Sequence, residues 1–364
     1  MTHRVTLIPG DGIGPEVVDA ARGAVDATGA AIAWEPHDLG RGAFERIGEV
    51  LPQATLGSIR SNGVALKGPI ETPQDAGVRN ANVALRRELD LFANVRPCTR
   101  YAGVPSAYED VDLVVVRENT EDVYTGVEFE VGTEEGKQLI AFLEEATDVR
   151  IRPDSGISVK AISHEGSERI VRFAFEEARR GGRTAVVAAH KANIMKFSDG
   201  LFLEVARRVA AQYPDIAFDD RIIDALCMQL VQAPERFDVL VLPNLYGDIV
   251  SELAAGLIGG AAVAPGGHLG EEVAVFEATH GTAPRLAGRD RANPVGAMLS
   301  GVLLLRHLGE TDAGDRLEAA IAAVLAAGVD VTPDLRARGD DRPAVGTSRM
   351  TAAVIERVRD ASVA

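Results

Sequence analysis

The sequence predicts an α/β protein with a largely parallel sheet. Short apolar runs rich in β-branched residues alternate along the chain with segments of helical periodicity, which is the arrangement of parallel strands covered by helices. The 364 residues exceed the length of about 250 to 300 at which single cores usually stop growing. We therefore expect one large domain or two interlocked ones. The composition, 46% hydrophobic and 25% charged, is that of a globular protein.

The predicted elements follow one another in this rhythm from the N-terminus. They are strands over residues 5–10, 112–119, 184–193 and 237–244, and helices over residues 16–29, 200–213 and 248–260. After residue 326 the chain is rich in turn formers and charge, and a final short helix is expected over 350–360. Because parallel sheets bind ligands at the carboxyl ends of their strands, the residues that follow each strand are the first candidates for a site.

Charge and cysteine content exclude several classes of function. The formal net charge of −16 repels phosphate polyanions and anionic membrane surfaces, so nucleic acid and membranes are not expected partners. Cys98 and Cys227 are too few and too far apart for a disulfide framework or a zinc ligand set. The N-terminus has no apolar segment of signal-peptide length, and no stretch approaches the roughly 20 apolar residues of a membrane span. We therefore expect a cytoplasmic protein.

A glycine cluster, PGDGIGPEV at residues 9–17, follows the first strand. It fits G-x-G-x-G rather than the G-x-G-x-x-G of the dinucleotide-binding fingerprint, and no carboxylate ends a second strand about 20 residues later. We interpret it as a tight turn between the first strand and a helix, with Pro15 at an early helical position.

Arginines gather in the segment VRNANVALRRELDLFANVRP and at the end of a strand, VVVREN. They are Arg79, Arg86, Arg87, Arg96 and Arg117. Arginine grips carboxylates through paired parallel hydrogen bonds, so several of them in an acidic protein suggest a polycarboxylate substrate. The alternative, that helix arginines are solvated or pair with Glu88 and Asp90, is the better interpretation for any single one. Arg117 is the exception, because the strand before it is apolar throughout.

Lys191 and Tyr124 are candidates for proton transfer. A lysine in a cleft can lower its pKa and move a proton, whereas a lysine at a strand end is usually a surface charge. A phenol can donate a proton, yet most tyrosines are packing residues. From these residues alone both alternatives remain open.

Two carboxylates, Asp248 and Glu252, lie four residues apart in NLYGDIVSE. If a helix begins near Asp248, they share one helical face a turn apart, and two carboxylates held together repel unless a cation lies between them. Their oxygens suit Mg²⁺ or Mn²⁺, and Asp224 is a third candidate ligand. The alternative is that early-helix carboxylates favour the helix dipole, which explains Asp248 better than Glu252.

Eight segments in order resemble the metal-dependent β-decarboxylating dehydrogenases, the isocitrate/isopropylmalate dehydrogenase family. They are LIPGDGIGPEV, LKGPIETP, NVALRRELDLFANVRP, VVVRENTEDVYTGVE, HKANIMKFSDGLF, PNLYGDIVSELAAGLIGG, APGGHLG and FEATHGTAPRLAGRDRANP. The resemblance implies a two-domain α/β fold unlike the Rossmann fold. Residues 1–92 and 257–364 would form a large cofactor-binding domain, and residues 93–256 a small domain with a clasp-like insertion at about 122–163. It also implies a homodimer with shared active sites.

The resemblance assigns a role to most of the candidate residues. Arg86, Arg96 and Arg117 would grip the carboxylates of the substrate, Tyr124 would protonate the enolate carbon, and Lys191 would assist removal of the hydroxyl proton. Asp224, Asp248 and Glu252 would surround Mg²⁺ or Mn²⁺, with Lys191 and Asp224 coming from the neighbouring subunit. The cofactor would be bound by Thr72, Asn82, Glu277, His280, Gly281, Thr282, Ala283, Arg285 and Asn293, with His280, Gly281 and Asn293 holding its adenosine half.

The implied reaction is oxidative decarboxylation of isocitrate to 2-oxoglutarate and CO₂. Asn80 and Asn82 form a polar pair that suits a third carboxylate, because an apolar wall would leave that carboxylate unpaired at a cost of several kcal/mol. Family members of the isocitrate type usually have Ser in place of Asn80 and Asp in place of Glu252. Homoisocitrate, isopropylmalate and tartrate remain alternative substrates. A regulatory, non-catalytic subunit of a hetero-oligomeric isocitrate dehydrogenase is the alternative of another class.

The choice of cofactor depends on the residue after HGTAP. NAD-using members tend to carry an acidic residue there, and this chain has Arg285. NADP-using members tend to have Lys-Tyr there, and a Tyr and an Arg where this chain has Pro333 and Ala337. Arg285, helped by Arg336 or Arg338, would suit a 2′-phosphate, whereas the whole-chain likeness favours NAD. We place NAD slightly ahead of NADP.

Overall fold

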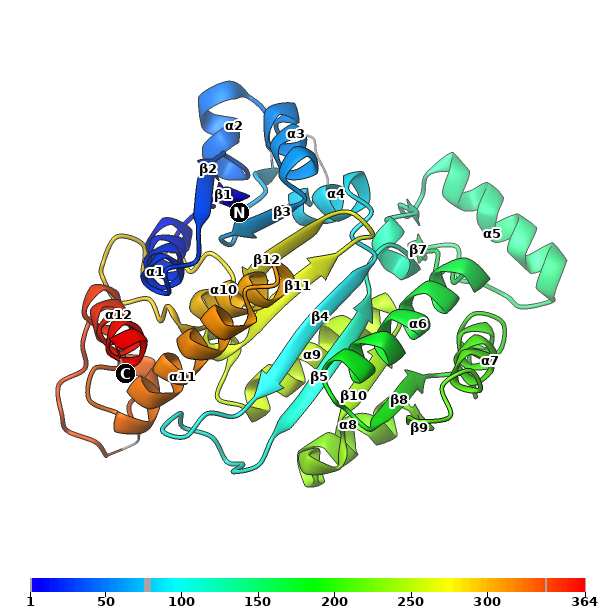
Figure 1. Cartoon of the computed structure of the whole chain (residues 1–364). Helices are drawn as coiled ribbons and strands as arrows, with labels where there is room; N and C mark the ends of the chain where they lie inside the picture. The colour runs from blue at the N-terminus through cyan, green and yellow to red at the C-terminus, as the bar shows by residue number, and fades with distance from the viewer. Residues whose placement is uncertain (1, 75–79, 338, 364) are drawn as a thin grey trace.

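The computed structural model describes residues 2–74, 80–337 and 339–363, and these residues form one large mixed sheet with helices on both faces (Figure 1). Its strands are β1 (His3–Ile8), β2 (Ile32–Pro36), β3 (Val64–Lys67), β4 (Ala93–Thr99), β5 (Asp112–Glu118), β8 (Ala185–His190), β9 (Ala217–Ile222), β10 (Val239–Leu242), β11 (Pro265–Leu269) and β12 (Ala274–Ala278). Their order across the sheet is β2-β1-β3-β12-β11-β4-β5-β10-β8-β9.

Two parallel blocks of strands make up the two halves of this sheet. Neighbours pair in parallel from β2 to β12 and again from β5 to β9, and β11 and β4 join the blocks through antiparallel pairing. The two blocks therefore run in opposite directions. The expected α/β class is confirmed, but the sheet is parallel only within each half. The sequence patterns did not reveal this, because the apolar run of β5 suits either direction of pairing and β4, ANVRPCT, has no apolar run at all.

Helices from both ends of the chain cover the half that contains β1, and both termini lie in this half (Figure 1). They are α1 (Gly14–Ala27), α2 (Arg41–Ile47), α3 (Gln53–Asn62), α4 (Ala81–Glu88), α10 (Val295–His307), α11 (Thr311–Ala327) and α12 (Thr347–Val363), with a 3₁₀ turn, η5 (Pro333–Leu335). Helix α10 packs on β11, β12 and α1. It is buried nearly all round, because apolar or small residues occupy every face of its sequence VGAMLSGVLLL.

The middle of the chain supplies the helices of the other half. They are α6 (His164–Arg180), α7 (Asp199–Ala210), α8 (Ile223–Gln232) and α9 (Asn244–Leu257), with the short turns η3 (Pro234–Arg236) and η4 (Ala261–Val263). Helix α6 buries a stripe at i, i+4 spacing, from Ile170 through Ala174 to Ala178, against the apolar side chains of β5 and β10. Ser163 caps its N-terminus by accepting from the Gly166 N–H at 2.9 Å.

The segment expected as a clasp projects from the body of the molecule. It contains η2 (Asp122–Thr125), β6 (Glu128–Phe129), α5 (Glu134–Thr147) and β7 (Ile157–Ser158), and β6 pairs with β7 outside the main sheet. Helix α5 extends away from the other helices (Figure 1), and Phe142 on it is 63% exposed. The clasp role and the domain boundaries stay predictions.

Two helices, α9 and α12, begin three or four residues before their predicted starts. Helix α9 begins at Asn244 rather than near Asp248, because Pro243 starts it directly after β10. Helix α12 begins at Thr347 and is longer than the short helix expected over 350–360. Its first turn is anchored by Thr347, whose hydroxyl lies 2.5 Å from the Ala292 carbonyl. Among the described residues no helix has the length and apolarity to span a membrane.

Candidate active site

Strands β5, β10 and β8 are parallel neighbours, so their carboxyl ends meet at one edge of the sheet. Arg117 is at the end of β5 opposite Leu242, and helix α9 begins two residues after Leu242. The side chain of Arg117 lies against this helix at Gly247, where a Cβ atom would stand 2.4 Å from Arg117 Cγ. Gly247 was expected to end a turn before the helix, but it lies within α9. Because glycine has no side chain, it leaves room for Arg117.

Arg117 is the centre of a buried polar cluster. Its side chain is 1% exposed, and its Nη1 lies 2.5 Å from Asp248 Oδ1. Its Nε and Nη2 donate to Asn244 Oδ1 at 3.0 and 2.7 Å. The Tyr124 hydroxyl donates to the other Asp248 oxygen at 2.5 Å, and the guanidinium lies 4.9 Å from the Tyr124 ring centroid. Because α9 begins at Asn244, Asp248 stands beyond its first turn, so these partners, rather than the helix dipole, explain its position.

Arg96 and Arg86 complete what we call the arginine cluster, Arg86, Arg96 and Arg117. Arg96 projects from β4 and donates through Nη1 to Ser251 Oγ at 2.6 Å and Glu252 Oε1 at 3.0 Å. Arg86, on α4, lines the same pocket as Arg96. Glu252 thus pairs with an arginine in this chain, and its role as a metal ligand stays a prediction.

Burial and the closeness of like charges shift the pKa values of the arginine cluster and of Asp248. Burial, and then Arg86, lower the pKa of Arg117 to about 10, while Asp248 opposes this shift. Burial also lowers the pKa of Arg86, with Glu277 opposing it and Arg96 adding to it. Burial alone would raise the pKa of Asp248, but Arg117, Tyr124 and Arg96 outweigh it and lower that pKa. The three guanidinium groups face two carboxylates, Asp248 and Glu252, so an excess of positive charge remains that an anion would neutralise.

A cavity of about 140 Å³ connects the cluster to the predicted cofactor residues. It is lined by Pro69, Ile70, Asn82, Arg86, Asn94, Arg96, Gly266, His268, Glu277, Ala278, Thr279, His280 and Gly281. Two buried polar atoms there, Asn82 Oδ1 and His280 Nε2, have no hydrogen-bond partner within the described part of the chain. Buried polar groups are normally paired, so both atoms are suited to a ligand.

The glycine cluster supports the predicted cofactor loop. The Ile13 N–H donates to the Thr282 carbonyl at 2.9 Å, and a Cβ on Gly12 would stand 2.0 Å from that oxygen. Ala283 follows with a φ of 37°. Asn293 is buried and donates to Asp334 at 2.8 Å, whereas Arg285 is exposed. Arg336 is bound to the carbonyls of Gly328, Val329 and Pro343, and Arg79 and Arg338 lie outside the described residues.

Asn80 and Thr72 position helix α4 in this structure. Asn80 is its N-cap, and its Oδ1 accepts from the Asn82 N–H at 2.9 Å. Thr72 Oγ1 accepts from the Ala81 N–H at 2.9 Å. Ser is an equally good N-cap, so Asn80 keeps the local helix geometry that the usual family residue would give.

Lys191 and Asp224, which we call the lysine pair, lie apart from the arginine cluster. Lys191 follows β8, and its Nζ contacts Oδ1 of Asp224. The side chain of Asp224 is 67% exposed. Across residues 2–74, 80–337 and 339–363 no three Asp, Glu, His or Cys side chains stand together as a metal site. One chain therefore does not bring Asp224, Asp248 and Glu252 around a common cation. In this chain Lys191, Arg117 and Arg96 neutralise them separately.

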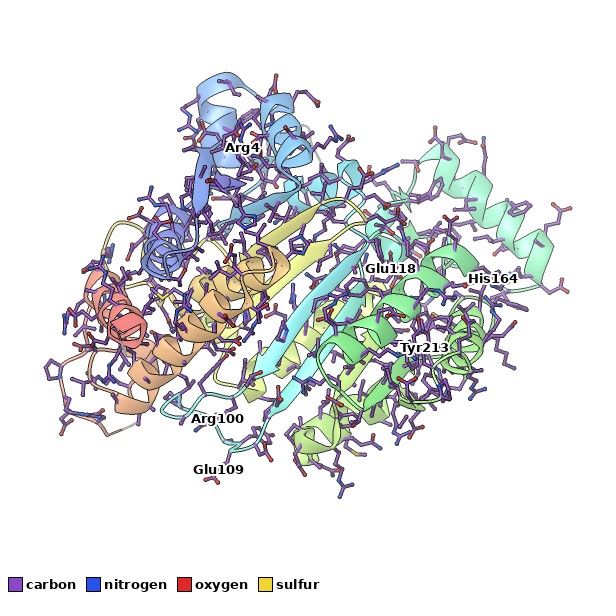
Figure 2. The ribbon with its side chains drawn as sticks, viewed as in Figure 1. Arg4, Arg100, Glu109, Glu118, His164 and Tyr213 are labelled. Atoms are coloured by element: carbon purple, nitrogen blue, oxygen red, sulfur yellow. The ribbon has the colours of Figure 1, made fainter. Side chains whose placement is uncertain are left out.

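Several site residues were missed from the sequence. Lys67 is completely buried and pairs with Glu277, which in turn lies 2.8 Å from His268 Nε2. Burial, and then Arg86, lower the pKa of His268 to about 3, so its ring is neutral. A lysine directly after the buried strand VAL was a usable signal for Lys67. Glu118, labelled in Figure 2, accepts from the N–H groups of Thr120 and Glu121 and so shapes the loop before Tyr124.

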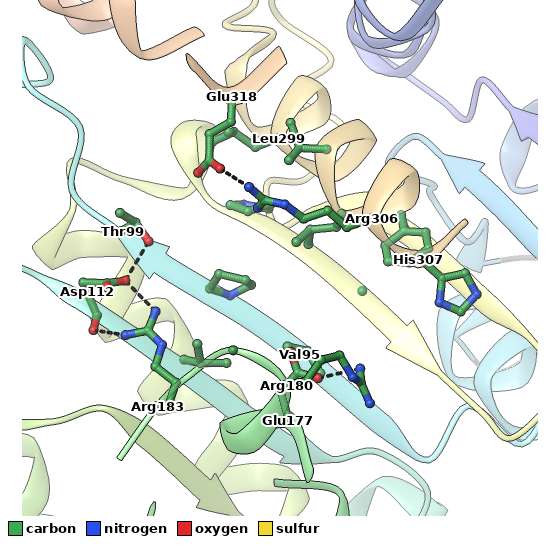
Figure 3. Close-up of a pocket in the computed structure, with 18 of the residues that line it drawn as sticks. Val95, Thr99, Asp112, Glu177, Arg180, Arg183, Leu299, Arg306, His307 and Glu318 are labelled. Atoms are coloured by element: carbon green, nitrogen blue, oxygen red, sulfur yellow. Dashed lines mark hydrogen bonds and ion pairs between the residues drawn. The ribbon is translucent and has the colours of Figure 1, made fainter. Parts of the chain in front are cut away.

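A larger hollow of about 650 Å³ lies between α6 and α10 (Figure 3). Its charged side chains are paired with one another: Arg183 with Asp112, Arg306 with Glu318, and Arg180 with Glu177. Because none of the predicted site residues lines it, the smaller cavity beside the arginine cluster is the candidate active site.

Proteins of known description resemble the chain over nearly its full length. A Caenorhabditis elegans protein described as a probable NAD isocitrate dehydrogenase subunit alpha, mitochondrial, is 44% identical over 98% of this chain and 93% of its own length. The human mitochondrial NAD isocitrate dehydrogenase subunit alpha is 45% identical over 91% of this chain and 85% of its own. The crystal structure of isocitrate dehydrogenase from Methylococcus capsulatus matches with a TM-score of 0.89 and 47% identity, covering 98% of this chain and 100% of that one.

The expectation of a cytoplasmic protein is contradicted by these curated relatives, which are described as mitochondrial. It depended on the lack of an apolar leader. Mitochondrial transit peptides are amphipathic and rich in Arg and Ser rather than apolar, so that observation did not bear on this compartment.

The family profile described as isocitrate/isopropylmalate dehydrogenase matches residues 4–354. This match covers almost the whole chain, and the eight segments that suggested the family lie within it. The chain therefore belongs to the isocitrate/isopropylmalate dehydrogenase family.

Proposed function

We propose that this protein oxidises and decarboxylates isocitrate to 2-oxoglutarate and CO₂ with reduction of NAD. The observation that carries the proposal is the arginine cluster beside Tyr124 and Asp248, of which Arg86 and Arg96 line a cavity that continues to the cofactor loop. Three arginines match the carboxylates of a tricarboxylic acid. The names of the relatives, which are NAD isocitrate dehydrogenase subunits, support the same substrate and cofactor.

The residues of the chain suit the steps of this reaction. The arginine cluster binds and orients the carboxylates, which places the hydroxyl-bearing carbon at the cofactor side of the cavity. Tyr124 is kept protonated, because burial and the hydrogen bond to Asp248 raise its pKa. Its hydroxyl is therefore available to protonate the carbon left after CO₂ departs. Lys191 would assist removal of the substrate hydroxyl proton.

The residues present fit a dinucleotide and, in part, a metal. His280 Nε2 and Asn82 Oδ1 are unpaired polar atoms on the cofactor side, and bound NAD supplies the hydride acceptor. When a divalent cation is bound, it supplies positive charge beside the developing enolate oxygen. One chain offers Asp248 with Glu252 beside it, so the remaining ligands, including Asp224, would have to come from elsewhere.

A second copy of the chain is the proposed source of Asp224 and Lys191. Large apolar side chains are exposed around the lysine pair, with Phe197 95%, Ile194 69% and Met228 54% exposed. Clusters of this kind mark protein interfaces. A homodimer would bury them and bring the lysine pair to the arginine cluster of the other copy. The curated relatives are named subunits, which favours mixed assembly as the alternative.

Steady-state reduction of NAD and, separately, NADP with Mn²⁺ and each of isocitrate, homoisocitrate, isopropylmalate and tartrate tests the proposal. We expect turnover with isocitrate, a higher kcat/KM with NAD than with NADP, and loss of activity in excess chelator. Binding of isocitrate as a shift in Tm without turnover of any of the four acids would instead show a regulatory subunit.

A further inference from the structure

Three buried charged side chains outside the arginine cluster form what we call the buried triad: Asp122, Lys160 and Asp199. Both carboxylates are 0% exposed and the lysine is 15% exposed. Lys160 Nζ lies 2.9 Å from Asp122 Oδ1 and 3.6 Å from Asp199 Oδ1. One ammonium group thus compensates two buried carboxylates, each of which would be costly to leave unpaired.

Asp122 holds the turn that carries Tyr124. It adopts a φ of 68°, a conformation that is uncommon for residues other than glycine, so its contacts must maintain it. Its carboxylate accepts from the Val123 N–H at 2.8 Å and from the Leu245 N–H at 3.0 Å. The second bond joins η2 to the first turn of α9, which is the helix that carries Asp248.

Asp199 holds the loop that carries Lys191. Its Oδ2 accepts from the backbone N–H of Lys191 at 2.7 Å. Tyr246 of α9 fills the space beside the triad, and its ring centroid lies 4.8 Å from Lys160 Nζ. Burial, and then the neighbouring Asp199, raise the pKa of Tyr246, so its hydroxyl stays neutral and the charge balance of the triad is unchanged.

We propose that Lys160 is a positioning residue that fixes the backbones beneath Tyr124 and Lys191 with one buried charge. None of the ion pairs within the buried triad includes a member of the arginine cluster. Lys160 therefore sets the placement of the two proton-transfer groups and leaves the capture of carboxylates alone. This inference rests on the proposed function. If Lys191 serves the site of a second copy, the triad also ties that site to the Tyr124 site of its own chain.

The first test compares Lys160→Met with Arg183→Met. Arg183 is a matched control, because it too lies between two carboxylates, 2.7 Å from Asp112 and 3.1 Å from Asp238, but lines the hollow of about 650 Å³. We expect both variants to lower Tm, but only Lys160→Met to lower kcat, by about 10-fold to 100-fold as for a misplaced catalytic group. KM for isocitrate stays within about threefold of wild type, since the arginines are untouched. Lys160→Arg restores most of kcat. A folded Lys160→Met with wild-type kcat overturns the proposal.

The second test needs no activity, so it separates failure of this inference from failure of the proposed function. Amide hydrogen exchange is measured at Leu245 and Lys191, two of the three backbone donors to the triad. We expect both amides to exchange about 10-fold faster in Lys160→Met than in wild type or Arg183→Met, because local opening becomes easier. If Lys160→Met does not fold, Asp199→Asn replaces it, and faster exchange at Lys191 is expected. If these amides exchange in the variant at the same rate as in wild type, the proposal about Lys160 is overturned, whether or not the wild-type protein oxidises isocitrate.

Discussion

Arg117 of the arginine cluster lies near the end of β5 and Lys191 of the lysine pair follows β8, and these strands run parallel on either side of β10. The first region is buried and the second is exposed. Arg117, in β5, has a side chain that is 1% exposed and bonded to Asp248, whereas the side chain of Asp224, the partner of Lys191, is 67% exposed. Helix α9 covers the first region, and a loop with exposed apolar side chains surrounds the second. The difference teaches that one chain assembles the proposed substrate-binding arginines in its interior but leaves the proposed proton-transfer residue Lys191 and its partner Asp224 at its surface.

The largest expected effect comes from substituting Tyr124 in one chain and Lys191 in another and then mixing the two chains. Tyr124→Phe and Lys191→Ala should each lower kcat by about 10²-fold to 10⁴-fold, as expected for loss of an acid or base group. If each site draws on two copies, mixing the variants creates dimers in which one site has both native residues. Such a mixture should recover about a quarter of wild-type activity, because half of the dimers are mixed and one of their two sites is intact. Recovery is measured as NADH formation after joint refolding. No recovery would place Tyr124 and Lys191 in the same chain's site.

Gly247→Ala should displace Arg117 in the buried arginine cluster and leave the exposed lysine pair unchanged. Its Cβ would stand 2.4 Å from Arg117 Cγ and 2.6 Å from Arg117 Cβ, so the arginine or the helix must shift. We expect a loss of about 1–3 kcal/mol in the free energy of unfolding, typical of overpacking, and a higher KM for isocitrate. Gly256→Ala, on the same helix with no atom near the added Cβ, is the control and should be neutral or stabilising. Equal effects of the two substitutions would contradict the close contact at Arg117.

The smallest expected effect is a change in the pH dependence of stability, which should differ between Asp248→Asn and Asp224→Asn. Arg117 and its neighbours lower the pKa of Asp248 in the folded chain. Its carboxylate therefore contributes stability above the unfolded pKa of about 3.9, and this contribution is lost as pH falls through the lower folded value. Asp248→Asn should cost about 1–3 kcal/mol near pH 7 as one charged hydrogen-bond partner is lost, and this cost should shrink towards pH 3. Urea unfolding at both pH values measures it. Asp224→Asn should change stability less at either pH, since Asp224 is largely exposed.

Much of the fold was predictable because periodicity and glycine usage are local properties. The first strand, the helix after it and the early position of Pro15 follow from residues 5–29. The antiparallel centre was missed although β4 and β5 are consecutive and joined only by residues 100–111, because the sequence ANVRPCT of β4 has no apolar run that would have predicted a strand. The start of α9 was misplaced for a different reason. Gly247 suggested a turn, but its missing side chain accommodates Arg117 from another strand.

The candidate site shows the same limit. Arg117 was singled out by the apolar strand before it, and its burial bears out that reasoning. Asp122, Lys160 and Asp199 were not singled out from the sequence, because their burial results from segments that meet only in the folded chain. The separation of Asp224 from Asp248 within one chain was expected only from the family resemblance, which assigns Asp224 to the neighbouring subunit, and not from the spacing of the residues.

The pairing of β3 with β12 has a consequence for how the chain is made. These parallel neighbours are separated by more than 200 residues, since Val64 pairs with Ala274, whereas β5, β8, β9 and β10 all lie between residues 112 and 242. During synthesis the middle of the chain can form its four-stranded block early. The first strands, by contrast, remain without a sheet neighbour on one side until residue 278 has left the ribosome. Chaperone contacts should therefore concentrate on residues 3–67 of the nascent chain.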